Sequence, residues 1–135
     1  MNKYMERSGD KKLSFRLRPR QRIKKRADFN RVFAEGLRVG DDRLTLWARS
    51  AGGDTTRLGI SVGKKSGSAV RRNRYKRTLR EAFRWAQHQL PPGWDMVLIP
   101  RPLAQVSTRH YYNSIIRLAR RINRRSDKFK NNAEI

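Results

Sequence analysis

The side chains best suited to chemistry in this sequence are the arginines and lysines that crowd residues 69–84. This stretch reads A-V-R-R-N-R-Y-K-R-T-L-R-E-A-F-R, in which Glu81 is the single acid. A guanidinium group is a planar fork that binds phosphate through two hydrogen bonds and also stacks on bases. The stretch therefore indicates binding of a polyanion.

Residue types that carry out catalysis are sparse by comparison. Cysteine is absent, and the two histidines, His88 and His110, fall in different predicted helices without a metal-ligand partner at a useful spacing. No two carboxylates are placed to hold a pair of metal ions, and no Gly-rich loop followed by Lys-Ser or Lys-Thr is present. We therefore expect no catalytic residue and no metal ligand here, which favours a cofactor to catalysis over a catalyst.

An amphipathic helix over residues 70–90 must position the cations, because projection at about 100° per residue separates two faces. The core-facing arc comprises Tyr75, Leu79, Ala82, Phe83, Ala86 and Leu90. The opposite ridge comprises Asn73, Arg77, Arg80 and Arg84, flanked by Arg74 and Lys76. Like charges three or four residues apart repel by about 0.2–0.5 kcal/mol per pair, so a polyanion lying along the ridge would relieve the helix. A merely solvated basic face is the alternative.

The charge of the whole chain points the same way. Its 135 residues include 34 Lys and Arg against 11 Asp and Glu, a net charge of +23. This length allows one domain with a modest core, and this charge indicates a polyanionic partner. A membrane surface competes, but no apolar run approaches the roughly 20 residues that span a bilayer. The charged N-terminus lacks the apolar segment of a signal peptide, so we expect a cytoplasmic protein.

Two predicted elements before the basic helix carry aromatic side chains. Residues 27–35 form a short helix whose apolar face includes Phe29 and Phe33. Residues 43–50 form a strand with Trp47 on its polar face, beside a basic residue. An accessible ring offers an unpaired base a stacking platform, whereas a buried ring belongs to the core. The residues alone leave both interpretations open.

The elements together predict a single-domain α+β sandwich in the order α-β-β-α-β-α, with helices packed on a sheet of about four strands at most. The predicted strands span residues 43–50, 57–62 and 95–100, and the predicted helices residues 27–35, 70–90 and 108–124. We expect the first two strands to form a hairpin. The third is nearly all apolar, which is typical of a buried central strand.

Residues 69–84 resemble the signature helix of the protein subunit of bacterial ribonuclease P. The preceding G-I-S-V-G-K-K-S-G at residues 59–67 and the D-F-N-R-V-F at residues 28–33 are similar to the same family. The resemblance covers roughly residues 20–125. The chain departs from the family pattern in a longer N-terminal extension and in Gly63, where many relatives carry a polar residue.

The resemblance implies three parts of the chain and a specific fold. Residues 1–19 would be a basic, disordered extension, residues 20–125 the ribonuclease P protein domain, and residues 126–135 a frayed tail. The implied fold is shared with the second domain of a small-subunit ribosomal protein. It includes a left-handed β-α-β crossover, whereas the general rule for parallel strands would make this crossover right-handed.

The resemblance also implies a division of labour with RNA. In this family the RNA subunit uses bound Mg²⁺ to hydrolyse the phosphodiester that joins the 5′ leader to mature tRNA, while the protein binds the catalytic RNA and the leader of precursor tRNA. By position, the residues expected to contact the RNA subunit are Lys64, Lys65, Arg72, Asn73, Arg74, Lys76, Arg77, Arg80 and Arg84. Those expected to form the leader cleft are Phe29, Phe33 and Trp47.

We accordingly expect a monomeric protein in a one-to-one complex with the RNA, with neither DNA nor a membrane as partner. The main alternative is a general basic RNA-binding or ribosome-associated protein, which would bind RNA without stimulating tRNA maturation. A DNA-binding protein and a self-sufficient nuclease are weaker alternatives, since the chain shows no dimerisation seam for paired half-sites and no catalytic cluster.

Overall fold

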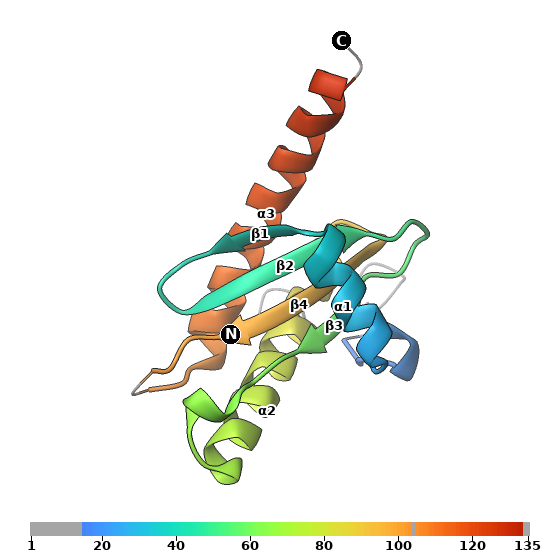
Figure 1. Cartoon of the computed structure of the whole chain (residues 1–135). Helices are drawn as coiled ribbons and strands as arrows, with labels where there is room; N and C mark the ends of the chain where they lie inside the picture. The colour runs from blue at the N-terminus through green and yellow to red at the C-terminus, as the bar shows by residue number, and fades with distance from the viewer. Residues whose placement is uncertain (1–14, 104, 134–135) are drawn as a thin grey trace, which may run out of the picture.

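A four-stranded mixed sheet in the order β1-β2-β4-β3 organises this small α+β domain (Figure 1). The computed structural model describes residues 15–103 and 105–133. The strands are β1 (Leu37–Gly40), β2 (Leu44–Ser50), β3 (Arg57–Ile60) and β4 (Trp94–Pro100). The helices are α1 (Arg26–Glu35), α2 (Ala69–Ala86) and α3 (Thr108–Ala133), with 3₁₀ turns η1 (Pro19–Gln21), η2 (Lys64–Ser66) and η3 (Gln87–Gln89).

β4 lies inside the sheet because its apolar run is covered on both faces. It pairs antiparallel with β2, where Leu46 is the partner of Leu98, and parallel with β3, where Leu58 is the partner of Met96. The predicted central strand is confirmed. The predicted hairpin between residues 43–50 and 57–62 is wrong, because β4 separates β2 from β3.

The strand absent from the sequence prediction is β1, which forms a hairpin with β2. It has four residues, including Gly40, so its alternation is too short to stand out in the sequence. Asp41 closes the hairpin, since its Oδ1 accepts hydrogen bonds from the backbone N–H groups of Arg43 and Leu44 at 2.9 and 3.0 Å. The element order is therefore α-β-β-β-α-β-α, one strand more than predicted.

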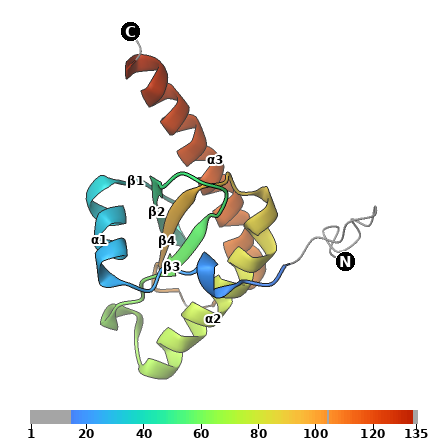
Figure 2. The same cartoon turned by 90° about the vertical axis from the view of Figure 1, so that its right-hand side faces the viewer.

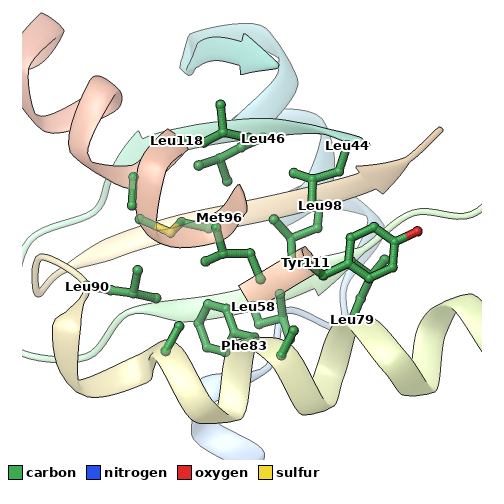
Figure 3. Packing of buried hydrophobic residues seen from close by; sticks show 14 of the residues in the cluster. Leu44, Leu46, Leu58, Leu79, Phe83, Leu90, Met96, Leu98, Tyr111 and Leu118 are labelled. Atoms are coloured by element: carbon green, nitrogen blue, oxygen red, sulfur yellow. The ribbon is translucent and has the colours of Figure 1, made fainter. Parts of the chain in front are cut away.

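Helices cover both faces of the sheet, with α2 and α3 on one face and α1 on the other (Figures 1 and 2). The larger core lies on the α2–α3 face, where Leu46 and Leu98 of the sheet join Phe83 of α2 and Leu118 of α3 in one buried cluster (Figure 3). The predicted apolar arc is confirmed, because its members from Tyr75 to Leu90 are all buried. The predicted helix over residues 70–90 is too long, since α2 ends at Ala86 and continues into η3, and Leu90 has an extended backbone.

A smaller cluster lies between α1 and the opposite face of the sheet. Alternation along β2 creates it, because Leu46 and Ala48 point into the main core and Trp47 between them points toward α1. The buried members of this cluster are Ile23, Val32 and Val97, and the partly buried ones are Phe29, Phe33, Trp47 and Ile99. This partly open cluster, and not the main core, holds the aromatic residues of interest.

Both ends of the domain differ from the prediction. Leu17 is 9% exposed and belongs to the main core, so residues 15–25, which we call the N-terminal arm, already pack on the domain before the expected boundary at residue 20. α3 continues to Ala133, where a frayed tail after residue 125 was expected, and its last turns extend beyond the sheet (Figure 1). Residues 1–14 of the expected extension lie outside the described residues. In the part of the chain that the structure describes, no helix combines the length and apolar character needed to cross a membrane.

Candidate nucleic-acid interface

α2 begins at Ala69 because Ser68 caps it. The Ser68 Oγ accepts a hydrogen bond from the backbone N–H of Arg71 at 3.2 Å. Gly67 adopts φ +112°, a conformation that L side chains rarely take, and so permits the turn into the helix. η2, directly before this turn, presents Lys64 and Lys65 as exposed side chains. Two lysines and the N–H groups of the first helical turn are thereby collected at one end of α2.

The predicted basic ridge lies on the face of α2 that points away from the core. Its exposed members are Asn73, Arg74 and Arg77, and its half-buried members are Arg72, Lys76, Arg80 and Arg84. The Nε of Arg72 is buried without a hydrogen-bond acceptor among the described residues. Within residues 15–103 and 105–133, the side chains of α2 form a single ion pair, between Arg84 and Glu81. Most of the ridge thus carries positive charge that the protein itself does not neutralise.

Arg84 differs from the rest of the ridge because its guanidinium is held within the protein. Its Nε and Nη2 donate to the two carboxylate oxygens of Glu81 at 3.0 and 2.6 Å, and its Nη1 donates to the carbonyl of Phe15 at 3.4 Å. The hydrogen bonds from Arg84 lower the pKa of Glu81, which keeps this acid charged. Arg84 therefore ties the N-terminal arm to α2, and its fork is already occupied.

A basic cleft lies between α1 and the middle of α2. One cavity of about 270 Å³ is lined by Arg22, Lys24, Lys76 and Arg80 beside the ring of Phe29. A second cavity of about 450 Å³ shares Lys24, Phe29 and Lys76 with the first and continues to the ring of Phe33. Among the described residues, the lining of both cavities includes no Asp or Glu. The cleft thus combines cations and aromatic rings without a compensating acid.

The cations of the basic cleft repel one another. Burial, and then the positive charge of Arg22, lowers the pKa of Arg80. Arginine side chains in proteins keep their positive charge, so Arg80 contributes a cation to the cleft. An anion placed among such groups is attracted by all of them and relieves their mutual repulsion. The electrostatics of the basic cleft therefore fit a bound phosphate group.

The wall of the basic cleft on the α1 side is aromatic. Phe29 lies directly over Gly59 of β3, where a Cβ atom would come within 2.7 Å of the ring. Phe33 packs edge-to-face on Trp47, with ring centroids 5.6 Å apart and planes at 89°. The structure thus brings the three predicted aromatic residues together. Phe29 and Phe33 line the cleft, whereas Trp47 supports Phe33 from β2 and lines neither of the two cavities.

The sequence prediction missed Arg22 and Lys24 as residues of the cleft. They flank Ile23, whose backbone N–H donates to the carbonyl of Leu58 at 2.8 Å, so the arm makes an isolated parallel bridge to β3. Ile23 is buried, and its neighbours point outward by alternation. The signal was a single apolar residue between basic ones in R-Q-R-I-K-K at residues 20–25.

Arg57, also missed, fixes α1 against the sheet. Its Nε and Nη2 donate to the two carboxylate oxygens of the buried Asp95, each at 2.8 Å. Its Nη1 lies 3.6 Å from the Oδ2 of Asp28 on α1. The hydrogen bonds to Asp95 raise the pKa of Arg57. This bridge positions the helix that carries Phe29 and Phe33.

Groups that hold metal ions do not gather in the part of the chain described by the structure. No three His, Cys, Asp or Glu side chains there lie close enough together to hold a metal ion. His88 packs edge-to-face on Phe15, with ring centroids 4.9 Å apart, and His110 is exposed on α3. The chemistry that the described residues offer is phosphate binding and base stacking.

Known proteins of one family match this chain over nearly the whole domain. The family model described as Ribonuclease P matches residues 17–123. The ribonuclease P protein component of Shouchella clausii is 39% identical over 101 residues, which cover 73% of this chain and 83% of that relative. The component of Thermotoga petrophila is 42% identical over 82 residues, which cover 61% and 70%.

Solved structures extend the likeness from sequence to fold. The RNase P protein from Thermotoga maritima is 36% identical, with a TM-score of 0.68 over 75% of this chain and 96% of its own. The RNase P protein of Staphylococcus aureus is 35% identical, with a TM-score of 0.63 over 76% and 94%. The family match includes α1, the sheet, the basic cleft and α2, and not the basic helix alone. The chain therefore belongs to the Ribonuclease P family.

Proposed function

We propose that this chain is the protein component of a bacterial ribonuclease P and binds two RNAs on adjacent surfaces. The ridge of α2 binds the catalytic RNA subunit, and the basic cleft binds the single-stranded 5′ leader of precursor tRNA. The observation that carries this proposal is the acid-free cleft, which has aromatic rings on one wall and the basic helix of the family signature on the other.

The RNA subunit would be bound mainly through phosphate contacts. The residues that we assign to it are Lys64, Lys65, Arg72, Asn73, Arg74, Lys76, Arg77 and Arg80. Each phosphate contact adds about −0.9 on B-form DNA and about −0.7 on single strands to the slope of log K against log salt concentration, so binding should weaken steeply with salt. Arg84 adds charge to this surface, while its guanidinium holds the arm.

The leader would lie in the basic cleft as a single strand. Phe29 and Phe33 offer faces or edges on which unpaired bases stack, and Trp47 keeps Phe33 in place. Lys24 and Lys76, which line both cavities, would hold the phosphates between these bases. Stacking accepts every base because each has a π-face, so the cleft should bind leaders of many sequences.

The RNA subunit with its Mg²⁺ would carry out phosphodiester hydrolysis, and the protein would neutralise charge and orient the leader. In this role it is a non-catalytic part of an endonuclease, acting in the cytoplasm as one protein copy for each RNA. The family resemblance supports a left-handed crossover from β3 through α2 to β4, and with it the fold of the ribosomal protein domain.

A cleavage assay at low Mg²⁺ concentration tests this proposal. Precursor tRNA is incubated with a bacterial ribonuclease P RNA, with and without the protein, and with the protein alone. We expect accurate 5′ cleavage at low Mg²⁺ only when both the RNA and the protein are present. Binding of the RNA without any gain in cleavage would favour a general RNA-binding protein. Cleavage by the protein alone would contradict our inference that the protein has no catalytic residues.

A further inference from the structure

A second basic cavity lies away from both surfaces described above. It has a volume of about 270 Å³ and is formed where the N-terminal arm crosses the C-terminal end of α2 and the loop between β2 and β3. Its charged or titratable lining residues are Arg16, Arg18, Arg20, His88 and Asp54. We refer to this cavity as the arm pocket. Its net charge is positive, since three arginines face a single acid among the described residues.

Alternation along the arm directs its arginines into this pocket. Arg18 has an extended backbone, with φ −83° and ψ 156°, and extended residues point to opposite sides in turn. Leu17 takes the inner side and is buried in the main core. Arg16 and Arg18 therefore lie on the outer side, and both line the cavity. The arm thus forms one side of the cavity, with Leu17 facing the core and the arginines facing the cavity.

A chain of hydrogen bonds holds this wall against the helix. The backbone N–H of Arg18 donates to the Oε1 of Gln21 at 2.7 Å, and the Nε2 of Gln21 donates to the Oε1 of Gln87 at 3.0 Å. The Nε2 of Gln87 in turn donates to the carbonyl of Arg84 at 3.0 Å. The Phe15 ring packs edge-to-face on His88. These contacts fix the backbone that carries the arginines, so the arm pocket is pre-organised.

The size and lining of the arm pocket fit a phosphate better than a drug-sized organic ligand. Its volume of about 270 Å³ lies below the roughly 300–1,000 Å³ of typical small-molecule sites. Such sites are mostly apolar, whereas three arginines, two threonines, two glutamines and a histidine dominate this lining. The C-terminal end of a helix attracts one nearby cation, but it does not account for three arginines contributed by another segment. Arginine forks around a polar cavity are the usual arrangement for an oxyanion.

We propose that the arm pocket binds a backbone phosphate of RNA and gives the protein a further RNA contact, separate from the α2 ridge and the basic cleft. This inference rests on the proposed function, because it takes RNA as the partner. Arg72 and His88 are 16 residues apart, which corresponds to about 24 Å along a helix. An RNA held at both ends of α2 would thus be fixed in orientation as well as in position.

The test compares two double variants that remove the same charge. Arg18→Ala with Arg20→Ala removes two arginines from the arm pocket, whereas Arg109→Ala with Arg124→Ala removes two exposed arginines from α3. Affinity is measured over a salt series for the ribonuclease P RNA alone, and for precursor tRNA binding to the assembled holoenzyme. A third variant, Arg18→Lys with Arg20→Lys, keeps the charge but removes the fork. Circular dichroism and thermal unfolding check that each variant folds.

For the arm-pocket variant we expect about tenfold weaker binding of one RNA and a salt slope reduced by about 1–2 units, as for one or two lost phosphate contacts. The lysine variant should recover only part of the loss, and the α3 variant should stay close to wild type. A loss confined to the ribonuclease P RNA assigns the phosphate to that RNA, and a loss confined to precursor tRNA assigns it to the substrate.

Equal effects of the arm-pocket and α3 variants on both RNAs would overturn the proposal, because the arginines would then act only through net charge. Failure of the wild-type protein to bind either RNA would be a different result, since it would contradict the proposed function itself.

Discussion

Arg125 of α3 donates a hydrogen bond from its Nη1 to the backbone carbonyl of Arg38 in β1, at 2.7 Å. Arg121, four residues earlier, donates to the carbonyl of Gly40 at 3.3 Å. Four helical residues rise about 6 Å and two strand residues about 6.7 Å, so the two repeats nearly match. Successive arginines on one face of α3 therefore meet alternate carbonyls of an edge strand.

Arg117 extends this row, because its Nη2 donates to the Oδ2 of Asp41 at 2.9 Å. A basic face of a surface helix is commonly exposed to solvent. The structure shows that Arg117, Arg121 and Arg125 instead hold β1 to the body of the domain. Exposed edge strands can pair with other chains, and the arginine row occupies acceptors that such pairing would use.

We predict that Arg125→Ala weakens the attachment of β1. Because this hydrogen bond is exposed to solvent, its loss should lower the free energy of unfolding by about 0.5–1.5 kcal/mol, the range for a typical hydrogen bond. Amide hydrogen exchange should speed up in β1 more than in β4, because β1 lies at the edge. Arg124→Ala is the matched control, an exposed neighbour on α3 without a hydrogen bond to β1 among those described. Equal exchange in both variants would contradict the role of Arg125.

A second prediction concerns acid and Asp41. Burial alone would raise the pKa of Asp41, but hydrogen bonds from the backbone N–H groups of Leu44 and Arg43 and from the Arg117 side chain lower it from 3.8 to about 2. Because the pKa is lower in the folded state, the charged carboxylate stabilises the fold above pH 3.8, and this stabilisation is lost as the pH falls toward about 2.

Asp41→Asn should therefore cost about 1–2 kcal/mol of unfolding free energy at neutral pH, allowing for solvent screening. The difference from wild type should shrink as the pH falls from 4 toward about 2, because the wild-type carboxylate becomes protonated over this range. Urea unfolding at several pH values measures both quantities. A difference that stayed constant down to pH 2 would show that Asp41 stabilises the hairpin by packing alone.

The third prediction separates the α2 ridge from net charge. Arg77 is exposed on the ridge, and Arg109 is exposed at the start of α3. Arg77→Ala should weaken binding of the ribonuclease P RNA by about 1–3 kcal/mol, an estimate from the energies of hydrogen bonds to charged groups, and flatten its salt dependence. Arg109→Ala should have a much smaller effect. Wild-type affinity in Arg77→Ala at physiological salt would remove this residue from the interface.

The fourth prediction uses the contact between Gly59 and Phe29. A Cβ at position 59 would lie 2.7 Å from the Cε1 and 2.9 Å from the Cζ of the Phe29 ring, so Gly59→Ala must displace that ring. Binding of a precursor tRNA with a long leader should weaken by about 1–3 kcal/mol, the typical stacking contribution of one base. Binding of mature tRNA and of the RNA subunit should change little.

Gly63→Ala is a suitable control for this experiment, since a Cβ at position 63 meets no atom within 4 Å. Leader-independent weakening in Gly59→Ala would mean that the substitution perturbs the fold and not the cleft. Thermal unfolding of the two variants distinguishes these cases.

Much of the fold follows from patterns that are local in the sequence. The arc from Tyr75 to Phe83 places α2 on the core because a 3.6-residue period brings those side chains to one face. The apolar run of β4 identifies a central strand for a similar reason. Alternation in β2 separates Leu46 from Trp47 and so assigns them to opposite faces of the sheet. Each of these features depends on residues fewer than about ten positions apart.

The sequence by itself determined the basic helix, the central strand, the positive charge and the family, because those depend on residue types and short periods. Tertiary structure decided which strands pair, since inserting β4 between β2 and β3 joins segments that are far apart in the chain. The tertiary structure also decided which cationic side chains are available to bind phosphate. Arg80 and Lys76 meet Arg22 in a cavity without an acid, whereas Arg84 is held by Glu81. These differences arise because charges act over distances in space and not over positions in the sequence.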